Sequence, residues 1–119
     1  MTRAPADELT NRFRPRIEAE LAELLAASEA STDARGPVAL DQQSVGRLSR
    51  MDAMQVQAMA QESERRRQAR IVALRAALRR MDDGEFGECA ECGEPIPEKR
   101  LAIDPTAVVC VGCAGGGGR

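Results

Sequence analysis

The stretch Gly84–Cys113 reads GEFGECAECGEPIPEKRLAIDPTAVVCVGC and contains all four cysteines of the 119-residue chain. The cysteines form two identical Cys-x-x-Cys pairs, and residues 93–109 separate one pair from the other. A two-residue gap lets both thiolates of a pair point from one tight turn at a single ion, so two pairs complete a tetrahedron. The expected metal ligands are Cys89, Cys92, Cys110 and Cys113.

Two disulfides or one redox-active pair are the alternative interpretation of these cysteines. The chain starts without a signal-peptide pattern, and no thioredoxin-like strand–helix pattern surrounds the pairs, so a metal site is favoured. The chain has no histidine, so the ligand set is all cysteine. Because four thiolates leave no open position for water or substrate, the spacing predicts one structural Zn²⁺ and no catalytic metal.

The cysteine-containing segment is too short to bury a core of its own, so we expect the metal to supply its folding energy. Zinc binding is worth on the order of 10–16 kcal/mol in comparable peptides. Gly93 follows the second cysteine and suits a left-handed turn. Phe86, one of only two aromatic residues, is expected to cover the metal site.

The composition up to about residue 83 is that of long helices, because Ala, Leu, Arg, Glu and Gln dominate and aromatic residues are nearly absent. The expected fold is mainly α, an antiparallel two-helix hairpin of the coiled-coil type followed by a four-cysteine zinc finger. The expected domains are a hairpin over residues 1–83 (helices over about 7–30 and 42–81, loop over about 31–41), the finger over 84–113 and a flexible tail over 114–119.

Apolar residues recur at steps of three and four along both expected helices. If the loop is centred near Pro37, Leu21 lies beside about Ala53 and Phe13 beside about Gln61. The second helix then outruns the first, and its last turns pack on the finger. Methionines at positions 51, 54 and 59 are expected to fill gaps in a thin two-helix core.

The charge balance argues against direct DNA binding. The net charge is −2 and the isoelectric point is near 5.3, whereas a protein that neutralises many phosphates usually carries a basic surplus. The arginine-rich stretch over residues 61–70 could form a basic patch. A solvated helix is favoured, with its arginines paired to acids of the first helix, such as Glu18 and Glu20, and to the local Glu62 and Glu64. No apolar run is long enough to span a bilayer. Together with reduced thiols, this predicts a cytoplasmic protein without a membrane partner.

The segment Asp82–Cys113 closely resembles the four-cysteine zinc finger of the DksA/TraR family of bacterial transcription regulators. The shared elements are an acidic lead-in, G-x-F-G-x-C-x-x-C-G, then I-P, R-L, P-T-A and the final C-x-x-C. The two expected long helices fit the family architecture. By this resemblance the chain is a short, divergent family member.

The resemblance implies RNA polymerase as the partner. Family members insert the helical hairpin into the secondary channel of the polymerase, where acidic residues at the tip approach the active site, often together with guanosine tetraphosphate. This chain lacks the family's Asp-x-x-Asp-x-Ala tip motif. The tip candidates are therefore Asp41, Asp52 and the adjacent Ala53, although Asp41 can equally cap the second helix.

Two other functions stay open from the sequence. The hairpin could serve a zinc-stabilised adaptor or structural protein, or the arginine-rich face could make a weak nucleic-acid-binding zinc module. An enzyme is not expected, because the chain has no histidine, no open metal position and no nucleophile–base pair. Activation or repression, alarmone dependence and oligomeric state are not specified by the sequence.

Overall fold

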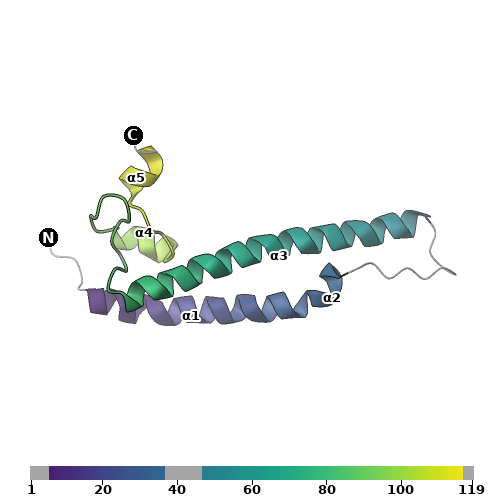
Figure 1. The fold of residues 1–119 in the computed structure, drawn as a ribbon, viewed down its shortest axis with the longest axis horizontal. Helices are drawn as coiled ribbons and strands as arrows, with labels where there is room; N and C mark the ends of the chain where they lie inside the picture. The colour runs from purple at the N-terminus through teal and green to yellow at the C-terminus, as the bar shows by residue number, and fades with distance from the viewer. Residues whose placement is uncertain (1–5, 37–46, 117–119) are drawn as a thin grey trace. The chain divides into compact units, whose positions relative to one another are not determined.

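The computed structural model describes residues 6–36 and 47–116, and this part of the chain is mainly helical, as predicted (Figure 1). Its only paired extended residues are Glu88 and Pro95, which form an isolated antiparallel bridge. None of the helices in these ranges is long and apolar enough to cross a membrane. In chain order the elements are α1 (Ala6–Ala30), α2 (Thr32–Arg35), α3 (Arg47–Asp82), α4 (Glu98–Ile103) and α5 (Val111–Gly116).

The chain divides into two compact units. We call residues 1–21 and 72–119 the finger unit, because they include the four cysteines, and residues 22–71 the hairpin unit. Helices α1 and α3 each contribute residues to both units. Each unit is described separately below.

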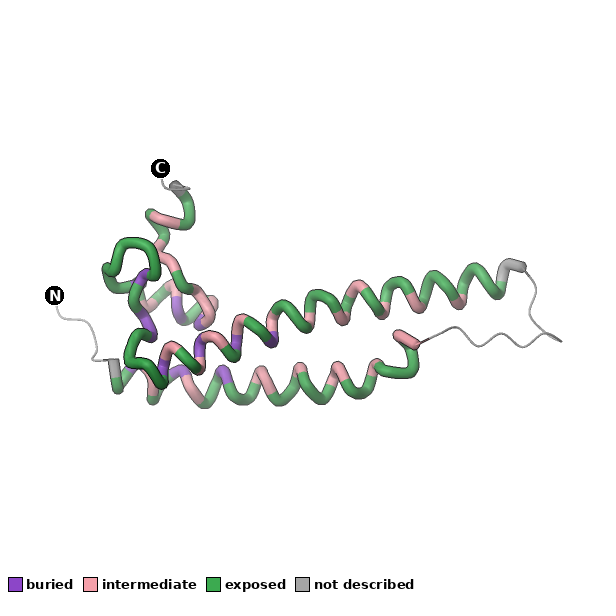
Figure 2. The backbone as a smooth tube through the Cα atoms, in the orientation of Figure 1, coloured by how far each residue is buried: buried purple, intermediate pink, exposed green. Residues whose placement is uncertain are grey.

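The finger unit has an apolar core to which α1, α3 and the cysteine-containing segment all contribute (Figure 2). On α1 the buried residues recur every fourth position, as one face of a helix requires. Leu74 and Leu101 have no exposed surface, so the end of α3 and helix α4 both face this core. The buried apolar side chains of this unit are Leu9, Phe13, Ile17, Leu74, Ala77, Met81, Phe86, Cys89, Ile96 and Leu101.

Contacts at the start of α1 hold the cysteine-containing segment in place. The rings of Phe13 and Phe86 lie 6.0 Å apart at an interplanar angle of 53°, a tilted arrangement that aromatic pairs favour. Phe86 is 4% exposed, and its expected position over the metal site stays a prediction. Arg12 pairs with Glu98 at 2.8 Å, and Arg16 donates to the backbone oxygen of Ala102 at 2.6 Å. The start of α1 is therefore packed against the segment that contains α4.

The predicted register of the two long helices is wrong. In the finger unit Arg14 donates to Asp82 at 3.0 Å, so the start of α1 lies beside the end of α3. In the hairpin unit Ser28 donates to Glu64 at 2.6 Å. Phe13 therefore belongs to the finger unit together with the end of α3, whereas Gln61 belongs to the hairpin unit. The prediction of the register assumed a loop centred near Pro37. In the described residues α2 ends at Arg35 and α3 begins at Arg47, so the centre lies later in the chain.

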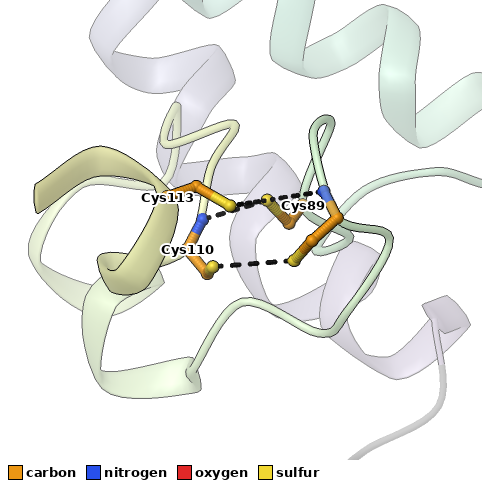
Figure 3. Close-up of side chains that lie close together, drawn as sticks. Cys89, Cys110 and Cys113 are labelled. Carbon is orange, nitrogen blue, oxygen red and sulfur yellow. Dashed lines mark hydrogen bonds between the residues drawn. The ribbon is translucent and has the colours of Figure 1, made fainter. Parts of the chain in front are cut away.

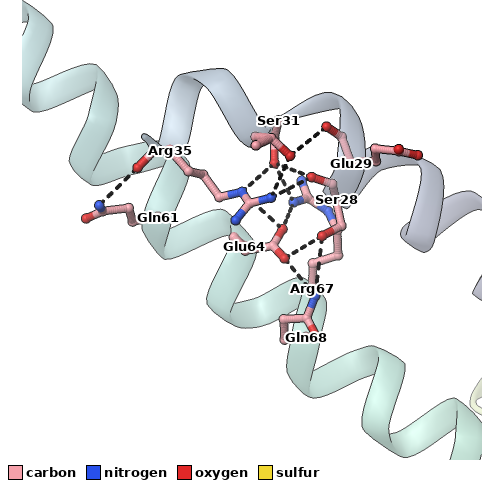
Figure 4. Close-up of polar contacts among 9 residues, drawn as sticks. Ser28, Glu29, Ser31, Arg35, Gln61, Glu64, Arg67 and Gln68 are labelled. Atoms are coloured by element: carbon pink, nitrogen blue, oxygen red, sulfur yellow. Dashed lines mark hydrogen bonds and ion pairs between the residues drawn. The ribbon is translucent and has the colours of Figure 1, made fainter. Parts of the chain in front are cut away.

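Polar groups join the helices of the hairpin unit, and Glu64 on α3 is at their centre (Figure 4). Its carboxylate accepts hydrogen bonds from Ser28 Oγ at 2.6 Å and Gln68 Nε2 at 2.7 Å and also contacts Arg67. Arg35 lies 3.8 Å from the carboxylate. Hydrogen bonds from Ser28 and Gln68, with the nearby guanidinium groups, lower the pKa of Glu64 to about 2 despite partial burial.

The methionines of α3 do not fill a core, contrary to expectation. Met51, Met54 and Met59 are 58%, 56% and 64% exposed. The side of α3 that contacts α1 and α2 instead presents polar side chains, among them Gln57, which donates to the backbone oxygen of Gly36. Polar contacts therefore make up much of the two-helix pairing in this unit, with Ile71 as its buried apolar residue.

The helix boundaries differ in detail from those expected. Helix α2 lies within the expected loop, and α5 continues through Gly116 into the expected tail, because Ala114 N–H donates to the Cys110 carbonyl at 2.9 Å and extends a helical turn. Residues 37–46, including Asp41 and the expected start of the second helix, lie outside the described part. The division into domains at residues 83 and 113 stays a prediction.

Replacing Leu74 with alanine should cost about 2–5 kcal/mol of unfolding free energy, because a fully buried leucine leaves a cavity in the shared core. The same change at Leu25, which is 41% exposed, should cost less than about 1 kcal/mol. Urea unfolding of the zinc-loaded protein measures both. Equal losses from the two variants would contradict the proposed core.

Glu64→Gln should destabilise the hairpin unit near neutral pH, because an amide cannot accept charge-assisted hydrogen bonds as a carboxylate does. The folded pKa of Glu64 is about 2 and its ordinary value is 4.5, so the carboxylate's contribution is complete above about pH 4.5 and is lost as the pH falls towards 2. The difference in stability of the hairpin unit between wild type and Glu64→Gln should shrink as the pH falls from about 4.5 towards 2.

Glu62→Gln provides the matched control, because Glu62 pairs with Arg65 and Arg66 of its own helix and is 40% exposed. Acid also displaces zinc from thiolates, so the readout is amide hydrogen exchange within residues 22–71. The prediction is contradicted if Glu64→Gln changes the amide exchange by the same amount at every pH. It is also contradicted if Glu62→Gln changes the exchange as much as Glu64→Gln does.

Candidate metal centre

A tight turn presents the first cysteine pair. Gly93 N–H donates to the Cys89 carbonyl at 2.9 Å, and Cys89 N–H donates to the Glu94 carbonyl at 2.8 Å. Gly93 has a φ of +77°, the left-handed conformation that L side chains rarely adopt and that glycine was expected to supply here. These bonds fold residues 89–94 back on themselves and bring Cys92 beside Cys89.

The start of α5 presents the second cysteine pair. Cys110 directly precedes α5 and Cys113 lies within it. The Ala90 N–H donates to the Val108 carbonyl at 2.7 Å, and this bond joins the backbone before Cys110 to the turn that carries the first pair. Arg100 on α4 donates through Nε to the Val109 carbonyl at 2.9 Å and holds the same stretch of backbone before Cys110.

The four sulfur atoms lie within 4.8 Å of one another, and Figure 3 shows the side chains turned towards a common point. Cys89 Sγ is 3.6 Å from Cys113 Sγ, and Cys92 Sγ is 3.7 Å from Cys110 Sγ. A tetrahedron of sulfurs with zinc–sulfur bonds of about 2.3 Å has edges of roughly 3.8 Å. The spacing fits one tetrahedral zinc ion.

The same distances argue against the disulfide interpretation. A disulfide requires sulfurs about 2.05 Å apart, and all four cysteines are free thiols. Sulfurs placed this evenly across both pairs, rather than bonded within pairs, are positioned to bind one metal ion. A four-thiolate set selects zinc over hard cations such as magnesium, which prefer oxygen ligands.

The electrostatics of the cluster also call for a cation. Burial opposes ionisation of Cys89, but backbone N–H groups of Cys92 and Cys110 donate to its sulfur and bring its pKa down to about 6. Hydrogen bonding of the Cys113 thiol with the sulfurs of Cys110 and Cys89 raises the pKa of Cys113 to about 12. One sulfur thus ionises easily while a neighbour keeps its proton, and a divalent cation is what allows all four to be thiolates.

The tip candidates lie far along the chain from the cysteines. Asp52 and Ala53 are in α3, in the hairpin unit, where Asp52 is exposed and Ala53 is half-buried. Asp41 lies outside the described residues. The role of these three residues stays a prediction.

The sequence analysis did not predict the side-chain hydrogen bonds that hold the backbone around the metal site. Besides Arg100, the side chain of Asp104 accepts from Thr106 N–H at 3.0 Å and from its hydroxyl at 2.7 Å, which turns the chain after α4. An Asp-x-Thr sequence after an expected helix is a recognisable turn signal and could have predicted this bond.

The fold and the site together define a helical protein with a four-cysteine zinc finger. The family model for the prokaryotic DksA/TraR C4-type zinc finger matches residues 84–116. Residues 84–116 are therefore a zinc finger of the DksA/TraR C4 type, as the sequence motif predicted.

Named relatives match a part of the chain. The RNA polymerase-binding transcription factor DksA of Caulobacter vibrioides is 46% identical over 48 residues, which cover 40% of this chain and 34% of that protein. DksA of Haemophilus influenzae is 42% identical over 40 residues, covering 34% and 28% of the two chains. The chain thus matches about a third of the length of these relatives.

The fold likeness extends further than the sequence likeness. The solved structure of the transcription factor DksA2 from Pseudomonas aeruginosa superimposes with a TM-score of 0.77, covering 92% of this chain and 83% of that one, at 23% identity. At this identity the likeness establishes the fold: long helices followed by the finger.

The purified protein should contain one zinc ion per chain, and Cys113→Ser should lose it, because serine does not supply the soft ligand that a four-thiolate site needs. Elemental analysis measures the zinc. Chelator with reductant should collapse the amide NMR dispersion of residues 84–116. Ala114→Ser, which adds a hydroxyl at the next, exposed position, should retain the metal. Full zinc content in Cys113→Ser would overturn the ligand assignment.

Proposed function

We propose that this protein binds RNA polymerase and regulates transcription as a zinc-stabilised factor, not as an enzyme. The observation that carries the proposal is the four-cysteine finger over residues 84–116, in a chain that is 46% identical over 48 residues to a protein named as an RNA polymerase-binding transcription factor. In this proposal Cys89, Cys92, Cys110 and Cys113 hold one structural zinc ion, and the protein acts in the cytoplasm, where the polymerase is found.

The proposed binding element is the hairpin, entering the secondary channel. In the hairpin unit the helices run antiparallel, since Ser28 of α1 meets Glu64 of α3 and Gly36 meets Gln57. Narrow paired helices of this kind suit a channel. An acidic group at their far end would approach the polymerase active site, and a chain of net charge −2 can be steered towards a basic entrance.

Asp52 is the best-placed described candidate for the acidic tip group. It is exposed on α3 and lies closer to the start of that helix than the expected boundaries implied, because α3 begins at Arg47. Ala53 is its half-buried neighbour. We keep Asp41 as the second candidate from the sequence. Whether guanosine tetraphosphate modulates the activity is left to experiment.

The arginines of α3 support a protein partner over nucleic acid. Arg65 and Arg66 both pair with Glu62, and Arg67 contacts Glu64, so these cations are locally compensated. A surface that releases counterions from phosphates needs uncompensated charge. No described contact favours the nucleic-acid function over polymerase binding.

Zinc-loaded protein should bind core RNA polymerase with micromolar or better affinity, and a known secondary-channel occupant should displace it. Asp52→Asn and Asp41→Asn should bind normally, but at least one of them should lose most of the effect on transcription, because charge at the tip rather than binding area is removed. Asp83→Asn, an exposed aspartate in the finger unit, should behave as wild type. Absence of binding at low salt would refute the proposal.

A further inference from the structure

Helix α2 is a single turn that cannot hold its position by itself. It spans Thr32–Arg35, none of its side chains is buried, and Ser31 before it makes no side-chain cap hydrogen bond. A helix of four residues is not stable alone in water. Its position therefore depends on hydrogen bonds from other parts of the hairpin unit.

Two glutamine side chains of α3 donate to the backbone at the end of α2. Gln57 Nε2 donates to the Gly36 carbonyl. Gln61 Nε2 donates to the Arg35 carbonyl at 3.2 Å (Figure 4). Residues four apart lie on the same face of a helix, and the last carbonyls of a helix have no partner within it. The two amides thus satisfy two consecutive carbonyls, and we call Gln57 and Gln61 the glutamine clamp.

The side chain of Arg35 is held as well as its carbonyl. Nε donates to Ser31 Oγ at 2.8 Å, and Nη2 donates to the Ser28 carbonyl at 2.7 Å. Nε also lies 3.8 Å from the Glu64 carboxylate. The clamp residues and Glu64 follow one another at steps of four and three, so one polar face of α3 holds the end of α2.

The described start of α3, before the clamp, is largely uncovered. Over residues 49–56 every side chain is exposed except that of Ala53, which is half-buried. Among the residues that the structure describes, none of α3 before Gln57 has a hydrogen bond or ion pair with residues 6–36. Asp52 lies five residues before Gln57, about 7.5 Å along the helix. The clamp is therefore the interhelical support nearest to this acidic residue.

Removal of the clamp would lengthen the uncovered stretch of α3. With the clamp, residues 47–56 precede the first described bond between α3 and residues 6–36. Without it, the first is the bond from Ser28 to Glu64, and residues 47–63 precede it. Isolated helices shorter than about 12–15 residues are only marginally stable in water. The start of α3 would then fray more readily.

We propose that Gln57 and Gln61 are positioning residues, which hold the end of α2, keep the start of α3 helical and thereby hold Asp52 in place. The clamp acts through hydrogen-bond donors, because both contacts run from a side-chain amide to a backbone carbonyl. The transcriptional role of Asp52 rests on the proposed function. On that basis the clamp supports the effect on transcription and leaves the affinity for polymerase unchanged.

Gln57→Glu tests the donor, with Gln55→Glu as its control. Glutamate has nearly the shape of glutamine but does not donate, and at position 57 it places a negative charge beside the Gly36 carbonyl oxygen. Gln55 is exposed and has no hydrogen bond among the described residues, so the same change there adds only the charge. Both variants keep the finger unit and its cysteines unaltered.

Amide hydrogen exchange of the zinc-loaded full chain is the measurement. The Gly36 N–H reports on α2 because it donates to the Thr32 carbonyl at 3.1 Å, and the amides of residues 51–56 report on the start of α3. At these amides Gln57→Glu should speed exchange about fivefold or more, because a buried carbonyl loses its donor. Gln55→Glu should change exchange less than about twofold.

Gln57→Lys separates donation from packing. Lysine differs in shape from glutamine, but its ammonium group donates, and cationic side chains bond the last carbonyls of helices. Exchange in Gln57→Lys should stay within about twofold of wild type. Exchange as fast as in Gln57→Glu would show that the shape of the side chain matters rather than its donor, and would overturn the proposal.

A transcription assay supplies the functional readout. Gln57→Glu should bind core RNA polymerase within about twofold of wild type but lose most of the effect on transcription, whereas Gln55→Glu should keep both. A full effect on transcription in Gln57→Glu overturns the proposal, and so do equal exchange rates in the two glutamate variants. If the wild-type protein does not bind polymerase, the proposed function fails, while the exchange rates still decide whether the clamp holds the start of α3.

Discussion

Four sulfur atoms held within 4.8 Å of one another cannot all be ionised unless a cation lies among them, and the finger unit depends on that constraint. The segment that carries the cysteines buries Phe86, Ile96 and Leu101 in the core of the finger unit. We expect the metal to hold in place the loops that present these side chains. Metal binding is therefore coupled to the packing of Phe86 on Phe13, and through it to the start of α1.

Different kinds of interaction stabilise the two units. In the finger unit fully buried residues such as Ile17 and Leu74 give an apolar core. In the hairpin unit Ser28, Arg35 and Gln68 converge on one carboxylate, Glu64. Polar clusters are directional, so this one fixes which residues of α1 and α3 face each other without contributing much hydrophobic stabilisation. A narrow helix pair with little apolar burial gains a defined register in this way.

The sequence predicted what depends on local spacing. Cys-x-x-Cys repeated twice predicted the metal set, the three- and four-residue steps predicted the long helices, and Gly93 was correctly expected in a left-handed turn. It did not predict the register, because the contacts that set it join residues such as Arg14 and Asp82 that only the folded chain brings together. Charged residues are plentiful on both helices, and spacing alone does not select one pairing among many.

The methionines of α3 show most clearly why helical spacing alone led to a wrong prediction of which side chains are buried. An apolar residue at helical spacing is usually taken as core, and Met51, Met54 and Met59 were placed there on that ground. The side of α3 that pairs with α1 and α2 is instead occupied by groups such as Gln57 and Glu64, so the apolar residues fall on other sides of the helix. Periodicity identifies that a helix has an apolar face but not which neighbour covers it. Because polar groups such as Gln57 and Glu64 make the pairing contacts in this unit, Met51, Met54 and Met59 are left exposed on other sides of α3.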